Sequence, residues 1–85
     1  KNLKSVNLRM YPNPASSAVT IDYNNGISRI EIYSVLGNKL LNYRTEPSKT
    51  YDISMLEDGM YFIRFITTEE KVLRTLRLQK KSMRP

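Results

Sequence analysis

The chain has 85 residues, of which 40% are hydrophobic and 26% charged, a composition typical of one small globular domain rather than of a disordered segment. It contains no cysteine and no histidine, which excludes disulfides and thiolate chemistry and removes the usual general base and the commonest metal ligand. No apolar run approaches the roughly 18 residues that a membrane-spanning helix needs. The chain begins at Lys1 without a methionine, and we expect it to be an accessory module cut from a longer protein.

The net charge of +6 is unevenly placed along the chain. Six basic residues and no acidic residue lie from position 71 onward, so the whole positive surplus falls in the last 15 residues. Such a concentration attracts an acidic protein surface, an anionic glycolipid or a nucleic acid. It is equally typical of a solvated edge strand whose lysines discourage edge-to-edge pairing. Because no aromatic residue follows Phe65, the stacking platform of a nucleic-acid site is missing, and we expect no nucleic-acid partner.

Alternating apolar and polar residues predict short β-strands separated by turns along the whole chain. The Tyr11-Pro12-Asn13-Pro14 run ends the first strand, because proline cannot donate to a ladder. Asn24-Asn25-Gly26 ends the second, and Gly37-Asn38 ends the third. The expected strands lie near residues 6–10, 19–23, 30–33, 40–43, 51–53, 60–66 and 72–79.

Seven strands at this spacing predict an all-β fold, an immunoglobulin-like antiparallel β-sandwich. We expect the sandwich to span residues 8–81, with residues 1–7 as linker or the start of the first strand and residues 82–85 as a flexible tail. Residues 60–66 are apolar on both faces, which predicts a central strand. In the last strand, Val72, Leu76 and Leu78 are expected to share one face.

Two further local features are expected before the sixth strand. Residues 54–58 are long enough for a single helical turn capped by Ser54. The Gly59-Met60-Tyr61 sequence resembles a tyrosine corner, in which the hydroxyl binds upstream backbone as a strand begins.

The chain offers little for catalysis, and we do not expect an enzyme or a cofactor. Its carboxylates fall mostly in turns, where Asp52 is expected to cap the backbone rather than to catalyse. Glu57 and Asp58 are adjacent and point to opposite faces along a strand, and no ligand series of recognisable spacing indicates a metal site. Among the aromatics, Tyr33 and Tyr43 are candidates for a sugar-binding platform, although packing is the commoner role.

Four segments in this order resemble a known family. They are residues 11–16 (YPNPAS) followed by 19–21 (VTI), residues 30–41 (IEIYSVLGNKLL), residues 52–64 (DISMLEDGMYFIR) and residues 74–81 (RTLRLQKK). The chain is similar over residues 8–81 to the C-terminal sorting domains of the type IX (Por) secretion system of Bacteroidetes.

The resemblance implies that most of these motifs hold the fold together. The structural positions are Pro12, Asn13, Pro14, Gly37, Asp52, Leu56, Gly59 and Tyr61. Leu56 is expected to plug the core beneath its loop, and Gly59 to permit a tight approach. The recognition signal is implied to lie in the last strand, at Leu76, Arg77, Leu78, Gln79, Lys80 and Lys81. An exposed edge strand of this kind is recognised by strand addition from a partner, and its basic residues raise the encounter rate with an acidic receptor.

The resemblance also implies a route. The domain ends a larger protein that crosses the periplasm and is recognised by an outer-membrane translocon and shuttle proteins, which pass it to the cell surface or the medium. In many members a sortase-like peptidase removes the domain and joins the cargo to anionic lipopolysaccharide, so the domain is a substrate. The alternatives are a carbohydrate- or lipopolysaccharide-binding β-sandwich of a surface protein or machinery component, and a passive spacer. The exposed last strand, over residues 72–78, also permits a strand-mediated dimer.

Overall fold

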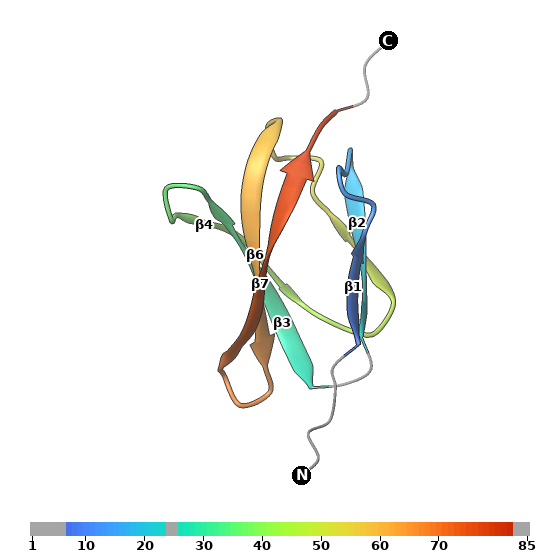
Figure 1. Ribbon diagram of the computed structural model, residues 1–85, viewed down its shortest axis with the longest axis vertical. Helices are drawn as coiled ribbons and strands as arrows, with labels where there is room; N and C mark the ends of the chain where they lie inside the picture. The colour runs from blue at the N-terminus through green and yellow to red at the C-terminus, as the bar shows by residue number, and fades with distance from the viewer. Residues whose placement is uncertain (1–6, 24–25, 83–85) are drawn as a thin grey trace.

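The computed structural model describes residues 7–23 and 26–82 as seven β-strands joined by turns (Figure 1). The strands are β1 (Leu8–Tyr11), β2 (Ala18–Tyr23), β3 (Ile27–Ser34), β4 (Lys39–Arg44), β5 (Lys49–Asp52), β6 (Gly59–Thr67) and β7 (Val72–Lys80). These described ranges contain no helix, and therefore none long and apolar enough to cross a membrane. Val6 and the Asn24-Asn25 pair, predicted to begin a strand and to form a turn, lie outside the described residues.

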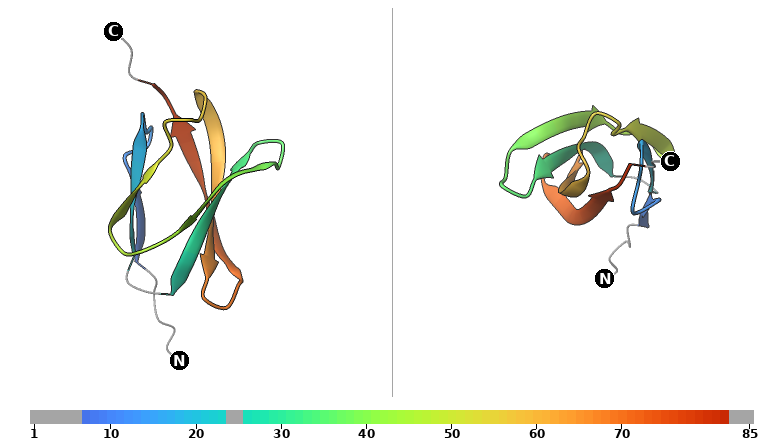
Figure 2. Two further views of the ribbon diagram at one scale, coloured as in Figure 1. Left: turned by 180° about the vertical axis from the view of Figure 1, so that it is seen from behind. Right: turned by 90° about the horizontal axis from the view of Figure 1, so that it is seen from above.

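The strands form two antiparallel sheets, ordered β1-β2-β5 and β4-β3-β6-β7. The two sheets face each other (Figure 2), and the buried side chains of the core lie between them. This arrangement confirms the predicted all-β sandwich of seven antiparallel strands. Because neighbouring residues of a strand point to opposite faces, burial alternates along β2, where every second residue lies in the core. The fully buried large side chains are Phe65, Ile21, Ile30, Ile32, Ile53, Ile63, Leu78 and Val19.

The expectation for the last strand was wrong at one position. Val72 was expected to share the buried face of Leu76 and Leu78, yet it is 51% exposed. The register explains this, because Phe65 pairs with Arg74 whereas the next residue, Ile66, pairs with Val72. This bulge places one extra residue on β7, which ends the alternation there.

The segment between β5 and β6 is a turn and not the helical turn expected over residues 54–58. The Leu56 N–H donates to the Ile53 carbonyl at 3.1 Å, which closes the turn. The Asp52 carboxylate, rather than Ser54, caps it by accepting the Ser54 N–H at 2.9 Å. The capping role predicted for Asp52 is therefore confirmed. Leu56 is 8% exposed and belongs to the core, as expected.

The start of β6 is a tyrosine corner, as predicted. The Tyr61 hydroxyl donates to the main-chain carbonyl of Glu57, which ties the strand to the loop before it. Gly59 has a φ of 150°, and a Cβ at this position would meet nothing within 4 Å. The residue is therefore required for its backbone conformation, and the tight approach expected there is absent.

Candidate recognition site

Five of the six predicted signal residues lie on β7, an edge strand that hydrogen bonds to β6 (Figure 1), and Lys81 directly follows its end. The six residues divide between two faces. Leu78 and Lys80 are buried at 0% and 2% exposure, and the half-buried Leu76 packs against the core. Arg77 and Lys81 are exposed, and Gln79 is half-buried. Only the second set is thus available to a partner without unfolding the strand.

Lys80 is buried and fastens the end of β7 to the turn before β6. Its ammonium donates to the Leu56 carbonyl at 3.0 Å and to Ser82 Oγ at 3.3 Å, and lies 3.9 Å from Asp58 Oδ1. A buried ammonium is tolerated only when it is paired and hydrogen-bonded, and these three groups meet that condition. Lys80 therefore acts as a clamp here.

Asp58 also binds the residue that follows the strand end. Its Oδ1 accepts the Ser82 N–H at 2.9 Å and the Ser82 hydroxyl at 2.7 Å. Ser82, expected in a loose tail, is thereby attached to the domain. Residues 83–85, the rest of that expected tail, lie outside the described residues.

The outer edge of β7 is partly closed by Asn13. The Asn13 side-chain amide donates to the Arg77 carbonyl at 3.0 Å and accepts the Gln79 N–H at 2.9 Å. These main-chain groups are the ones that an added strand would use. The side chain of Asn13 makes both bonds, between two prolines that have no N–H to donate.

Ala15 continues the closure by one residue pair. Its N–H donates to the Gln79 carbonyl at 2.8 Å, and its carbonyl accepts the Lys81 N–H at 2.9 Å. Ala15 is fully buried and forms a parallel bridge with Lys80. A partner strand added along the predicted signal would have to displace this segment. The edge that remains open in the described structure runs over residues 72–76, and both strand addition and a β7-mediated dimer would be restricted to it.

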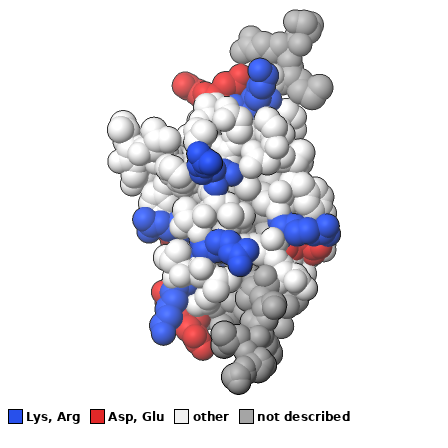
Figure 3. Space-filling view, viewed as in Figure 1, with Lys and Arg blue, Asp and Glu red and all other residues white. Residues whose placement is uncertain are grey.

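Basic side chains are spread over the face formed by β6 and β7 (Figure 3). Acidic atoms appear in that view only towards its margins. Of the six basic residues from position 71 onward, Lys80 is buried and does not contribute to the surface charge, and Arg84 lies outside the described residues. The exposed positive charge of β7 and its flanks comes from Lys71, Arg74, Arg77 and Lys81.

A network centred on Glu31 occupies the outer face of the same sheet. Glu31 is 5% exposed and accepts the Tyr33 hydroxyl at 2.7 Å, Arg29 Nη2 at 3.1 Å and Lys39 Nζ at 3.3 Å. The Tyr33 hydroxyl, followed by Arg29 and Lys39, holds the pKa of this carboxyl below its ordinary value despite burial. Arg64 lies over the Tyr33 ring, 4.5 Å from its centroid.

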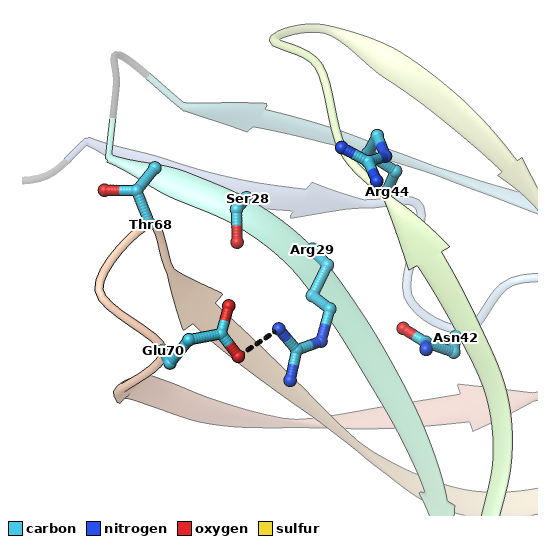
Figure 4. A pocket seen from close by; sticks show the side chains of 6 residues that line it. All are labelled: Ser28, Arg29, Asn42, Arg44, Thr68 and Glu70. Atoms are coloured by element: carbon cyan, nitrogen blue, oxygen red, sulfur yellow. Dashed lines mark hydrogen bonds and ion pairs between the residues drawn. The ribbon is translucent and has the colours of Figure 1, made fainter.

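A depression of about 380 Å³ lies beside this network, between β3, β4 and the β6–β7 turn (Figure 4). Glu70 turns toward Arg29 and binds its Nη1 at 2.7 Å, while Arg44 points away from the pair. Arg29 is already engaged by two carboxylates, so the depression presents a satisfied ion pair. No group of three or more acidic residues within the described ranges is placed to hold a metal ion.

The sugar-platform alternative finds no support in the two tyrosines on which it depended. Arg64 covers a face of Tyr33, as described above. The Tyr43 hydroxyl donates to the Asp52 carbonyl at 2.7 Å, and its ring packs 5.6 Å from that of Tyr51 at 39°. Both rings are therefore parts of the packing between strands.

The family model of the secretion system C-terminal sorting domain matches residues 9–79 of the chain. This match covers most of the chain, and the chain belongs to that family. The domain is a C-terminal sorting signal for type IX secretion, in a family that is not enzymatic, and its export ends at the cell surface or in the medium. No curated protein and no solved structure matches the chain.

Sequence reasoning missed the roles of two residues in this site. Asn13 was assigned only to the turn that ends the first strand, and Lys80 to an exposed basic end. Both make contacts with residues that are distant in sequence, 66 positions for Asn13 and 24 for Lys80. The one signal that pointed to Asn13 was its position between two prolines, which have no N–H to donate.

Proposed function

We propose that the sorting signal is a folded surface on which Arg77, Gln79 and Lys81 are read, while Leu76, Leu78 and Lys80 hold the strand in place. In this proposal the cargo crosses the periplasm, and the outer-membrane translocon and its shuttle proteins bind the folded domain. A sortase-like peptidase acts on those cargoes that are processed, and the domain is its substrate.

The observation that carries the proposal is the fastening of β7 at its C-terminal end. Asn13 and Ala15 hold its outer edge, and Lys80 holds its inner face. The three outward residues are therefore displayed on rigid backbone, which lowers the entropy cost of binding. Arg77 and Lys81 add positive charge, which speeds encounter with an acidic receptor.

The test is export of a fluorescent reporter with a signal peptide before it and these 85 residues behind it. The host is a bacterium with a type IX system, used with and without a working translocon. We expect the reporter at the surface or in the medium only when the translocon works. The R77A/K81A variant should remain in the periplasm with its domain folded.

The matched control is R44A/K49A, which removes the same charge from exposed positions on β4 and β5. It should be exported like the parent reporter. Equal export of R77A/K81A and the parent would contradict the assignment of the signal to the exposed residues Arg77, Gln79 and Lys81. Retention of the parent in both strains would contradict the export route itself.

A further inference from the structure

The hairpin between β3 and β4 carries apolar side chains at its tip. Leu36 is 86% exposed and Val35 60%, and Leu40 on the returning strand is 44% exposed. The hairpin projects sideways from the body of the domain (Figure 1), and this projection bears no charged atoms in the space-filling view (Figure 3). Neither Val35 nor Leu36 belongs to the core.

The tip is rigid. The Gly37 N–H donates to the Ser34 carbonyl at 2.9 Å, and the Ser34 N–H donates to the Asn38 carbonyl at 2.9 Å. The Asn38 N–H also donates to Ser34 Oγ at 3.2 Å. Gly37 has a φ of 94°, which a glycine adopts without strain. Val35 and Leu36 are thus held at the two central positions of a closed turn.

Turn chemistry does not explain these two residues. The central positions of such a turn accept most residue types, so the turn itself does not require an aliphatic pair. Here an aliphatic pair stands where it contributes nothing to the core. Val35, Leu36 and Leu40 are exposed together, and contiguous exposed apolar side chains, unlike isolated ones, mark interaction sites.

The flanking groups favour a protein pocket over a lipid surface as the occupant. A lipid-binding tip uses free aromatic and basic side chains at the membrane interface. The Tyr33 ring is covered by Arg64, and its hydroxyl is bound to Glu31. Lys39 is likewise bound to Glu31. Both side chains that would serve a membrane are engaged within the domain.

We propose that Val35 and Leu36 form an anchor that inserts into an apolar pocket on a protein of the type IX machinery. This inference rests on the proposed export function and adds a second contact, separate from the one made by Arg77, Gln79 and Lys81. A few side chains that fill well-packed, desolvated pockets carry most of the binding energy of an interface. Because the anchor is preformed, binding loses little conformational entropy.

The first experiment measures the initial rate of reporter export by pulse-chase for L36N, L36M and M55N. Met55 is the matched control, since it is 54% exposed in the turn between β5 and β6. We expect L36N to slow export about tenfold, because burial of one leucine corresponds to at least that factor in affinity. L36M and M55N should be exported at the parent rate.

All three variants should keep the thermal midpoint of the parent, because the replaced side chains are exposed. If L36N is exported at the parent rate while R77A/K81A is retained, the proposed anchor at Val35 and Leu36 is contradicted and the proposed export function is supported. If the parent reporter itself is not exported, the export function fails first.

The second experiment places a photoreactive amino acid at position 36 or 55 of the reporter. We expect a covalent adduct from position 36 to an identified translocon or shuttle protein, in the strain with the translocon only. Adducts to lipid, with flotation of the parent but not of L36N on phosphatidylglycerol-containing vesicles, would overturn the proposal in favour of a membrane. An adduct between two copies of the domain would overturn it in favour of a dimer.

Discussion

The side-chain oxygen of Asn13 accepts the main-chain N–H of Gln79 at 2.9 Å, so a residue from the first turn closes the edge of the last strand. The same amide donates to the carbonyl two residues earlier on β7. One side chain therefore does the work of a short added strand, and the predicted signal residues are not a free edge.

The first prediction concerns this contact. N13A should lower the free energy of unfolding by about 1–2 kcal/mol, because two hydrogen bonds to β7 are lost. Urea unfolding measures the change. N42A is the control, since Asn42 lies exposed on β4, and should change stability by less than about 0.5 kcal/mol. An N13A domain as stable as the parent would show that water replaces the amide at no cost.

The second prediction separates the charge of Lys80 from its aliphatic stem. K80A should destabilise the domain by about 2–4 kcal/mol, because it removes buried methylenes and leaves the Leu56 carbonyl without its donor. K80M keeps the stem, and we expect a loss of about 1–2 kcal/mol. Denaturant unfolding distinguishes the two.

K81A is the neighbouring control, with an exposed side chain and an expected change below about 0.5 kcal/mol. If K80A and K81A lower the free energy of unfolding by the same small amount, Lys80 does not stabilise the end of β7 in solution.

The third prediction is a pH dependence carried by Glu31. Its pKa is lowered in the folded domain, first by the Tyr33 hydroxyl and then by Arg29 and Lys39. A carboxyl with a depressed folded pKa contributes stability that is present above its unfolded pKa, about 4.3, and lost as the pH falls through the folded value. The parent should therefore exceed E31Q in stability at pH 7, and the difference should shrink below about pH 4.

Thermal unfolding of the parent and E31Q between pH 7 and pH 3 measures this difference. E69Q, a change in the exposed β6–β7 turn, serves as the control and should follow the parent curve. A gap between the parent and E31Q that stays constant with pH would assign the effect of E31Q to packing instead.

The fourth prediction tests the reason for Gly59. G59A should destabilise the domain by about 1–2 kcal/mol through backbone strain alone, because the added Cβ has open space around it. Larger side chains at this position should cost about the same as alanine. A steep increase with side-chain size in a G59A, G59S and G59L series, measured by denaturant unfolding, would restore the close-approach interpretation.

Much of the fold follows from local patterns. Alternation at Val19, Ile21 and Tyr23 places their strand correctly, because burial with a period of two is a property of any half-covered sheet. The two-sided apolar run around Ile63 correctly indicates a central strand. Turn residues such as Gly37 mark the hairpins, since few residues adopt their backbone angles.

What the local patterns could not supply depends on contacts between distant segments. Val72 reads as a core residue until the bulge opposite Phe65 and Ile66 changes the register. Lys80 reads as an exposed base, because its carbonyl partner at Leu56 lies in a loop that must fold against it. In both cases burial is decided by a residue on another strand or turn. The alternation of apolar and polar residues within one strand says nothing about such contacts.

The Asn13 contact joins positions 66 residues apart, so a partner can bind the finished surface of β7 only at a late stage of synthesis and folding. The displayed row on β7 is complete only after the ribosome has finished the last strand and the first turn has folded onto it. A cargo whose translation stopped early would lack β7, and a misfolded cargo would lack the contact of Asn13 with β7. Under the proposed function, export therefore requires that the cargo has been synthesised to its end and that the domain has folded.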